Sequence, residues 1–403
     1  MPDFSTYFLL DTGTAKRYAV EALGFFAPEE AVDCVEIGDG NINYVFRLCA
    51  RGGRSLILKQ ADRLLRSSGR PLDMGRSRIE AAILRLEGEL APGLVPEVYR
   101  YDERMSLTAM EDVSDYHNLR RELAANRVYP HLAEALSGFL ADTLLPTTDL
   151  VLDAEEKKRR VQFFTNPELC KITEDLVLTE PYYNYKDRNI LFPGTEEFVE
   201  ERLYRNEALH AAVAELRLGF MNNAQALLHG DLHTGSIFAN ETGVKILDPE
   251  FAFYGPMGYD IGNVIGNLFF SRVNKAFTMP TETAAIAALE RTIEDLWELT
   301  GKKLAAKYDA LVTLPLYRVA GFRGSYLAGI MADAAGYAGT ELIRRTVGDS
   351  KVAEVTAVTD PALRLPMERA LVELGIALIL GRRDFGTGGE LTALCRRVLA
   401  QEE

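Results

Sequence analysis

An excess of positive charge is missing from this sequence of 403 residues. Its 45 lysines and arginines are outnumbered by 59 aspartates and glutamates, which gives a formal net charge of −14. This balance argues against nucleic acid or an anionic membrane as a general partner. A small anionic ligand is still allowed, because a local cluster of donors can hold phosphates.

Cysteine pairs and long apolar runs are also scarce. The four cysteines form no C-x-x-C pair, so they indicate free thiols in a reducing compartment. Residues 1–22 lack the basic start and apolar run of a secretory signal. The apolar stretch from Ala370 to Gly381 is interrupted by Glu373 and is too short to span a bilayer. We therefore expect a soluble cytoplasmic protein with no membrane partner.

The length and the composition favour a globular protein with two lobes. A chain of 403 residues exceeds the size at which one hydrophobic core usually keeps growing. Hydrophobic residues make up 47% and charged residues 26% of the chain, an ordinary globular mixture.

Strand-like runs are concentrated in the first quarter of the chain. The expected order is strand, strand, helix, strand, strand, at residues 44–48, 55–59, 76–90, 95–99 and 106–110. A hairpin turn, R-G-G-R at 51–54, joins the first two strands. The basic loop at 63–70 is either a solvated connection or a mobile lid.

The rest of the chain is mostly helical. Apolar residues recur at helical spacing over 117–144, 200–228, 282–304 and 366–380, and one small β-like island lies at 225–253. With a linker near 111–114, the pattern predicts an α+β protein. Its small β-rich N-terminal lobe would span residues 1–113 and its larger, mostly helical C-terminal lobe residues 114–403.

Several short motifs fit phosphoryl transfer from ATP, which needs a phosphate cradle, a metal held by carboxylates and a base that orients the attacking hydroxyl. The stretch 38–43 (GDGNIN) precedes the first strand of the hairpin, and its Gly38 and Gly40 would let backbone N–H groups approach phosphates. The alternative is an ordinary turn. The chain contains neither a Rossmann G-x-G-x-x-G at this position nor a P-loop motif.

A lysine and a glutamate in the first lobe form the next candidate pair. Lys59 closes the second strand on the same face as Ile57, where it would contact the α- and β-phosphates; otherwise it is a strand-end lysine in solvent. Glu80, in the following helix, would pair with this lysine. Alternatively, Ser77 and Glu80 form a capping box.

The strongest local motif is HGDLH at residues 229–233. Asp231 would accept a hydrogen bond from a substrate hydroxyl and act as the base or orient the attack. The alternatives are a turn aspartate that bonds its own backbone and a zinc site made by His229 and His233. Zinc is disfavoured, because glycine stands where H-E-x-x-H has its glutamate.

Two carboxylates follow 17 residues later in Asp248-Pro249-Glu250, directly after an apolar strand-like run. Carboxylates two residues apart can meet one Mg²⁺ together with its phosphate ligands. A lone D-P-E is often only a turn, but its spacing from Asp231 is that of a kinase active site. Asp260, further on, is expected to be a helix N-cap and a brace for the catalytic loop.

Taken together, HGDLHTGSIF and DPEFAFYGPMGYDIGN resemble the 5-methylthioribose kinase family, within the aminoglycoside-phosphotransferase branch of kinase-like folds. GDGNINYVFR, LKQA and MEDVSD resemble it too, in the same order, and the resemblance covers about residues 35–345. It implies a two-lobed protein-kinase-like fold, a homodimer, and transfer of the ATP γ-phosphoryl group to the 1-hydroxyl of 5-methylthioribose in methionine salvage.

The resemblance also implies roles for individual residues. Asp231 would contact the sugar and act as base, with His233 beside it in the substrate site. The nucleotide and its Mg²⁺ would be held by a larger set, in which Asp248 and Glu250 are the metal ligands and the backbone of 111–113 meets adenine. That set is Gly38, Gly40, Asn41, Asn43, Lys59, Glu80, Glu111, Asp112, Val113, Asp248, Pro249 and Glu250.

Two features near the acceptor refine this assignment. Kinases and aminoglycoside phosphotransferases normally carry asparagine five residues after the catalytic aspartate, where this chain has Ser236. Glu250 would then supply the missing oxygen ligand, as D-P-E does in methylthioribose kinases. Arg344 and Arg345 resemble a family arginine pair near the sugar, where they would stabilise developing negative charge; alternatively, they are helix C-terminal cations.

Our hypothesis from the sequence is therefore an ATP- and Mg²⁺-dependent methylthioribose kinase with a small-molecule sugar substrate. One rival is a kinase of another small alcohol, such as 5-deoxyribose, an aminoglycoside or an amino alcohol. The other is a catalytically silent, kinase-like scaffold that only binds nucleotide.

Overall fold

The protein forms two compact units in a computed structural model that describes residues 3–38, 43–64 and 71–402. The first unit comprises Met1–Tyr116 and Lys245–Ala252, and the second comprises His117–Val244 and Phe253–Glu403. The chain thus returns to the first unit within strand β9 (Val244–Ile246). The single lobe boundary after residue 113 stays a prediction about domains.

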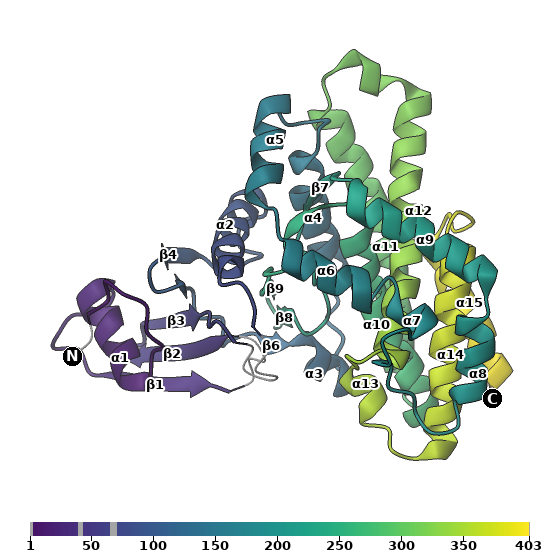
Figure 1. Ribbon diagram of the computed structural model, residues 1–403, viewed down its shortest axis with the longest axis horizontal. Helices are drawn as coiled ribbons and strands as arrows, with labels where there is room; N and C mark the ends of the chain where they lie inside the picture. The colour runs from purple at the N-terminus through teal and green to yellow at the C-terminus, as the bar shows by residue number, and fades with distance from the viewer. Residues whose placement is uncertain (1–2, 39–42, 65–70, 403) are drawn as a thin grey trace. The chain divides into compact units, whose positions relative to one another are not determined.

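A five-stranded antiparallel sheet organises the first unit (Figure 1). In spatial order its strands are β1 (Val32–Ile37), β2 (Tyr44–Ala50), β3 (Ser55–Gln60), β5 (Leu107–Met110) and β4 (Val98–Asp102). The hairpin between β2 and β3 turns at Gly53, whose φ of +87° is favourable only for glycine. β1 was not anticipated, and β4 begins three residues later than the sequence pattern predicted.

The two faces of strand β3 have different neighbours, and this difference positions the site. Leu56 and Leu58 join a buried core with Phe46 and Tyr18. That core lies beside helix α1 (Thr12–Arg17) and the π-helical turn Tyr18–Ala22. Because side chains alternate along a strand, Lys59 points to the opposite face. Helix α2 (Gly75–Leu90) provides the partner of Lys59, as described below.

The second unit is mainly helical, as the sequence pattern predicted, and Figure 1 shows its long helices lying beside one another. Its longer helices are α4 (Leu132–Leu144), α5 (Ala154–Phe163), α6 (Pro167–Leu176), α9 (Glu207–Asn222), α10 (Gly258–Thr278), α11 (Thr283–Leu311), α12 (Ala320–Val347), α14 (Pro361–Leu380) and α15 (Gly388–Glu402). Its short ones are α3 (Leu119–Ala124), α7 (Glu180–Tyr183), α8 (Glu196–Val199) and α13 (Ala353–Thr356), with single turns at Leu145–Thr147, Glu200–Tyr204 and Pro315–Arg318.

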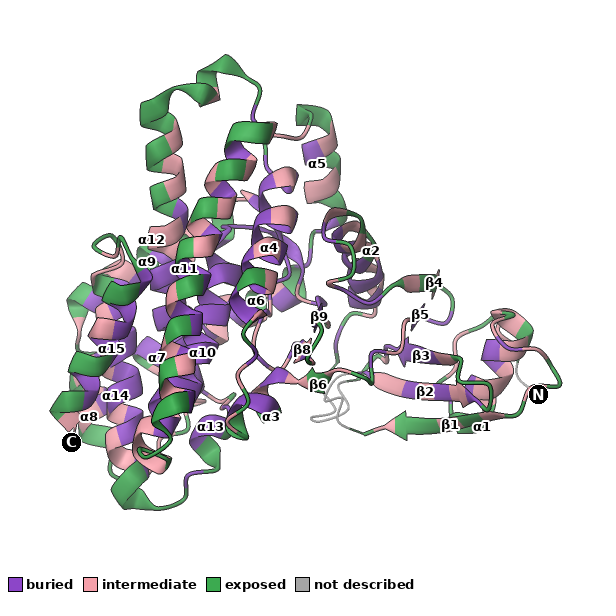
Figure 2. Ribbon diagram, turned by 180° about the vertical axis from the view of Figure 1, so that it is seen from behind, coloured by how far each residue is buried: buried purple, intermediate pink, exposed green. Residues whose placement is uncertain are grey.

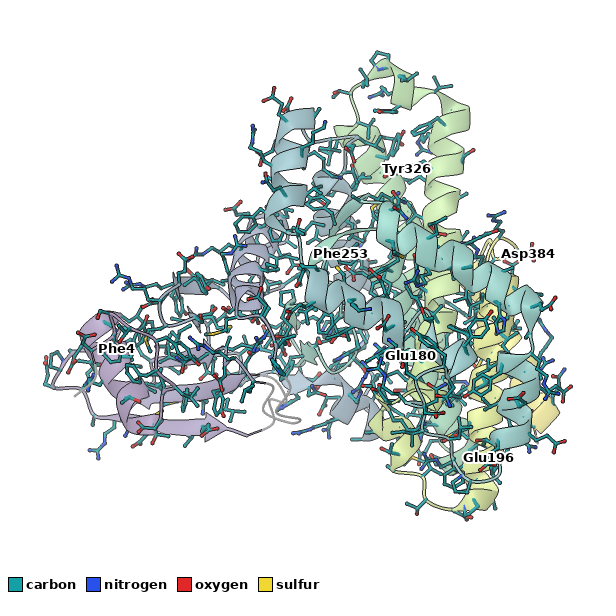
Figure 3. The ribbon with its side chains drawn as sticks, viewed as in Figure 1. Phe4, Glu180, Glu196, Phe253, Tyr326 and Asp384 are labelled. Atoms are coloured by element: carbon teal, nitrogen blue, oxygen red, sulfur yellow. The ribbon has the colours of Figure 1, made fainter. Side chains whose placement is uncertain are left out.

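Short strands interrupt this helical unit where the sequence suggested a β-like island. β7 (Ala226–Leu228) pairs antiparallel with β10 (Phe253–Gly255), and β6 (His117–Asn118) pairs with β8 (Ile237–Ala239). Phe253, labelled in Figure 3, packs on Phe220 of α9 with their ring centroids 4.6 Å apart. The helical spacing over 117–144 corresponds to two helices, since α3 ends at Ala124 and the chain turns at Asn126 and Pro130 before α4.

Helices α10, α12 and α14 approach one another so closely that glycine is required at their contacts. A Cβ on Gly339 of α12 would lie 2.4 Å from the carbonyl oxygen of Gly375 in α14. A Cβ on Gly262 of α10 would lie 2.5 Å from the carbonyl oxygen of Ala334 in α12. Figure 2 shows α10 almost wholly buried, whereas the N-terminal half of α12 is largely exposed.

Membrane-spanning helices are absent from the described part of the chain, because none of its helices combines the necessary length and apolar character.

Candidate active site

Lys59 is the centre of a buried ion-pair cluster in the first unit. Its Nζ lies 2.6 Å from Oε1 of Glu80 and 2.5 Å from Oδ1 of Asp248. Only 8% of Lys59 and 2% of Glu80 are exposed to solvent. Although burial acts to lower it, the pKa of Lys59 is raised by the negative charges of Asp248 and Glu80, so the amine stays protonated.

The pairing of Glu80 resolves one of the alternatives left by the sequence. Helix α2 begins at Gly75, with Met74 as its N-cap. Ser77 therefore lies inside the helix, where its hydroxyl donates to the carbonyl of Met74. Glu80 is the partner of Lys59 and is not part of a capping box.

A second group of side chains continues this cluster around Glu250. Asn43 donates to Oε2 of Glu250 over 3.3 Å, and the guanidinium of Arg76 donates to the amide oxygen of Asn43 over 3.2 Å. The Nε of Arg76 also lies 3.6 Å from Glu250. Burial raises the pKa of Glu250 to about 7, and the carboxylates of Glu80 and Asp248 act in the same direction.

The two carboxylates of D-P-E have different surroundings. Asp248 adopts a φ of +63°, and 49% of its side chain is exposed. Glu250, after the buried Pro249, is itself buried. Lys245, in strand β9, pairs with a different carboxylate, and its Nζ lies 2.8 Å from Oε2 of Glu111.

The cluster's charge and donor chemistry fit a divalent cation. Glu80, Asp248 and Glu250 carry three formal negative charges, against two positive charges on Lys59 and Arg76, when every group is ionised. Oxygen donors and a surplus negative charge are what Mg²⁺ prefers. Within the described residues, no group of three or more histidine, cysteine, aspartate or glutamate side chains is arranged around one metal position.

The predicted linker and glycine-rich residues are only partly described. Residues 111–113 directly follow strand β5, and the Glu111 N–H donates to the Glu97 carbonyl, so that donor is already used. The Asp112 carboxylate accepts from Nε of Arg47 over 2.7 Å, and Val113 is buried. Gly38 lies just after β1. Gly40, Asn41 and residues 65–70 of the basic loop lie outside the described residues.

The catalytic-loop motif begins where strand β7 ends in the second unit. The backbone N–H groups of His229 and Gly230 donate to the two carboxylate oxygens of Asp260, over 2.7 and 3.0 Å. Gly230 has a φ of +83°, which lets the chain turn there. Asp260 is thus a brace for this loop, whereas the N-cap role predicted for it is wrong, because α10 begins at Gly258 with Met257 as N-cap.

Asp231 follows this turn and is surrounded by positive or potentially positive groups. Its Oδ2 lies 3.4 Å from Nε2 of His233, and its Oδ1 lies 3.9 Å from Nη2 of both Arg344 and Arg345. Burial acts to raise the pKa of Asp231, but His233 and the two arginines lower it far below its ordinary value. The carboxylate is therefore fully ionised at neutral pH.

Ser236 contacts other residues of this loop through its hydroxyl and its backbone N–H. Its hydroxyl donates to the backbone carbonyl of Asp231 over 3.2 Å and lies 3.3 Å from Nδ1 of His233. Its backbone N–H donates to the His233 carbonyl over 2.9 Å. Ser236 therefore holds the segment from Asp231 to His233.

Glu341 is a site residue that sequence reasoning missed. It is fully buried on helix α12, and its carboxylate binds Nε of Arg344 over 2.5 Å and Nε of Arg345 over 3.2 Å. Asn267 of α10 donates to the same carboxylate over 3.1 Å. The E-x-x-R-R spacing was a signal for this contact, because residues three and four apart share one helix face.

The structure therefore brings the predicted residues together in two groups, one in each unit. The first contains Asn43, Lys59, Glu80, Asp248 and Glu250, joined by the unpredicted Arg76. The second contains Asp231, His233, Arg344 and Arg345, joined by the unpredicted Glu341. A common site for both groups stays a prediction.

Both a family and individual known proteins match this chain. Residues 33–298 match the family described as "Phosphotransferase enzyme family". A methylthioribose kinase of Erwinia tasmaniensis is 40% identical over 93% of this chain and 95% of its own length. One of Bacillus pumilus is 38% identical over 97% of both. A choline kinase structure from Cryptosporidium parvum Iowa II aligns over 97% of both chains with 12% identity and a TM-score of 0.49.

Proposed function

Since the chain belongs to the methylthioribose kinases, within the phosphotransferase enzyme family, we propose that it transfers the γ-phosphoryl group of ATP to the 1-hydroxyl of 5-methylthioribose, a step of methionine salvage. The main support is that each unit contains some of the charged side chains that such a transfer requires. The first has a protonated, buried lysine beside carboxylates, and the second has an ionised aspartate beside two arginines.

ATP is the ligand of the first unit in this proposal. Lys59 binds the α- and β-phosphates, and its contact with Glu80 holds the flexible amine in place. The backbone of 111–113 and the glycine-rich residues Gly38 and Gly40 complete the nucleotide site, together with Asn41 and Asn43. Asp248, 2.5 Å from the same amine, places a metal-binding carboxylate beside these phosphates.

Mg²⁺ is the metal of this proposal, held by Asp248 and Glu250. When bound, it would neutralise phosphate charge and orient the transferred group. The chain's own contribution is to keep Glu250 positioned through Asn43 and Arg76. Removing the metal with a chelator should abolish turnover, and added Mg²⁺ should restore it.

The sugar is the ligand of the second unit. Asp231 accepts a hydrogen bond from the 1-hydroxyl and directs its oxygen toward the phosphorus. Because Asp231 is a weak base with a strongly lowered pKa, orientation of the hydroxyl precedes proton transfer, which occurs late as the new O–P bond forms. Arg344 and Arg345 stabilise the negative charge that develops on the transferred group.

An ADP-release assay over a small panel of acceptors tests this function. The panel contains methylthioribose, 5-deoxyribose, an aminoglycoside and an amino alcohol. Turnover should be highest with methylthioribose, and Asp231→Ala should lower it by about 10³-fold, within the usual range for a positioned acid or base. Turnover with only another acceptor would refute the substrate, and ATP binding without any turnover would favour a scaffold.

A cytoplasmic homodimer is the final part of the proposal. The N-terminal half of α12 and the turn before it expose large apolar side chains, at Leu314, Leu316, Val319 and Phe322, of which Leu316 is 69% exposed. Tyr326, labelled in Figure 3, lies on the same half-helix. Such a patch is typical of a protein–protein contact. Leu316→Glu should convert the dimer to a monomer in sedimentation experiments, and a monomeric wild-type protein would refute the proposal.

A further inference from the structure

A buried carboxylate lies against the arginine pair and takes no part in the proposed transfer. Glu341 is 0% exposed, and an unpaired buried carboxylate would be strongly unfavourable. Both of its oxygens are bound. Oε2 accepts from Nε of Arg344 over 2.5 Å, and Oε1 lies 3.2 Å from Nε of Arg345.

The contacts divide each guanidinium into two functional ends. Glu341 binds the Nε side of both arginines. Nη1 of Arg345 donates to the hydroxyl of Ser350 over 2.8 Å, and Nη2 of each arginine lies on the side of Asp231. Nη2 of Arg344 and Nη2 of Arg345 each lie 3.9 Å from Oδ1 of Asp231. An arginine side chain has many rotamers, so a contact at Nε removes much of this freedom without using the terminal donors.

Charge supports the same interpretation. Two guanidinium groups on neighbouring residues repel each other in a buried site, and Arg344 indeed acts to lower the pKa of Arg345, as does burial, the larger cause. Glu341 lies against both and offsets one of the two positive charges. Together with Asp231, the four side chains are formally neutral, so the arginines can stay ionised in the protein interior.

A second link ties Glu341 to the loop that carries Asp231. Asn267 of α10 donates to Oε1 of Glu341 over 3.1 Å, and its own amide oxygen accepts from Arg120 over 3.0 Å. The backbone N–H of Arg120 in turn donates to the carbonyl of Thr234, three residues after Asp231. One amide thus connects the arginine pair and the catalytic loop.

The side chain of Glu341 is closely packed against α10. Gly266 of α10 faces it, and a Cβ there would lie 3.2 Å from Cβ and 3.3 Å from Cγ of Glu341. The side chain is therefore confined between α10 and its own helix. Because the carboxylate is confined, it also restricts the positions of Arg344 and Arg345, which bind it.

We propose that Glu341 is a positioning residue, which holds Arg344 and Arg345 with their Nη2 nitrogens directed at Asp231 and at the phosphoryl group transferred there. The catalytic part of this inference rests on the proposed function, whereas the holding of the arginines does not. Glu341 touches no reacting atom in this role. Its loss would misplace the donors that stabilise the transition state, and it would leave nucleotide binding in the first unit unchanged.

The test compares Glu341→Gln with a matched control in the full-length protein. Glu368→Gln removes the charge of another buried glutamate, which pairs with Arg364 over 2.8 Å within α14. Both variants keep the side-chain volume. The measurements are kcat and KM for both substrates, nucleotide affinity by calorimetry, and the ¹⁵N–¹H signals of arginine Nε–H groups, assigned with Arg344→Lys and Arg345→Lys.

Glu341→Gln should lower kcat by about 10- to 100-fold with nucleotide affinity unchanged. The Nε–H signals should show that the side chains of Arg344 and Arg345 are no longer ordered. Glu368→Gln should change neither. A kcat for Glu341→Gln within twofold of the control would overturn the proposal. If the wild-type protein does not turn over methylthioribose, the proposed function fails, and the Nε–H signals alone decide: persistent order in Glu341→Gln overturns the positioning role, and its loss supports it.

Discussion

Replacing Lys59 with methionine should destabilise the protein severely, because it leaves a buried carboxylate without its partner. Glu80 is 2% exposed and its contact with Nζ of Lys59 is 2.6 Å long. Removing one member of a buried ion pair typically costs about 3–5 kcal/mol. Methionine nearly preserves the volume of lysine, so little of this loss comes from packing.

The pH dependence of this effect follows from Glu80. Burial already raises the pKa of Glu80 in the wild-type protein, where Lys59 opposes the shift. In Lys59→Met that opposition is gone and the folded-state pKa rises further. A raised carboxyl pKa means that stability is lost as the pH rises from the unfolded-state value through the folded-state value. The deficit should therefore be larger at pH 8 than at pH 5.

Urea unfolding followed by fluorescence at both pH values measures the effect, with Lys302→Met as the control on an exposed position of α11. A double variant, Lys59→Met with Glu80→Met, should recover most of the loss, because an apolar pair of similar volume often replaces a buried ion pair without cost. The reasoning is refuted if Lys59→Met costs less than about 1 kcal/mol, or if the losses from the two single substitutions simply add in the double variant.

Three further changes test other parts of the structure. Gly339→Ala should cost about 1–3 kcal/mol in denaturant unfolding, because its Cβ would lie 2.4 Å from a carbonyl oxygen of α14, whereas Gly324→Ala in the open half of α12 should be neutral or stabilising. Asp260→Asn should lower kcat by about tenfold and leave KM for ATP unchanged, because it weakens one hydrogen bond to the loop. An unaltered kcat would exclude the brace role. Burial lowers the pKa of Lys351 to about 8, so the unfolded chain binds more protons between pH 8 and about 10.4 and stability should gain from this group as pH rises through that window. Lys351→Met should remove that gain in pH-dependent unfolding, and an identical slope in both proteins would contradict the shift.

The sequence was most informative where the chemistry is local. Asp231 and the D-P-E motif lie within short contiguous strings. The two-residue alternation of strand β3 placed Lys59 on the same face as Ile57, but it left open whether this lysine is exposed to solvent. The contact between Lys59 and Glu80 was one of two alternatives, because Glu80 could form either an ion pair with Lys59 or a capping box with Ser77. Only the position at which α2 begins decides between them.

The missed features depend on neighbours that are distant in the sequence. Arg76 contacts Asn43 and Glu250 across three segments of the first unit, and no local pattern indicates such a contact. Strand β1 alternates half-exposed with exposed residues at a sheet edge, so its pattern lacks the apolar face of a typical strand. The break between α3 and α4 did carry a local signal in Pro130, which the helical spacing on either side outweighed.

The first unit's discontinuity in the sequence has a consequence for protein synthesis. Residues 245–252 carry Asp248 and Glu250, and they are made only after the whole segment 117–244. When residue 116 has been added, the contacts of Lys59 with Asp248 and of Arg76 with Glu250 therefore cannot yet form. The first unit therefore lacks residues 245–252 until the segment 117–244 of the second unit has been synthesised. The order of folding in the cell therefore cannot simply follow the order of the chain.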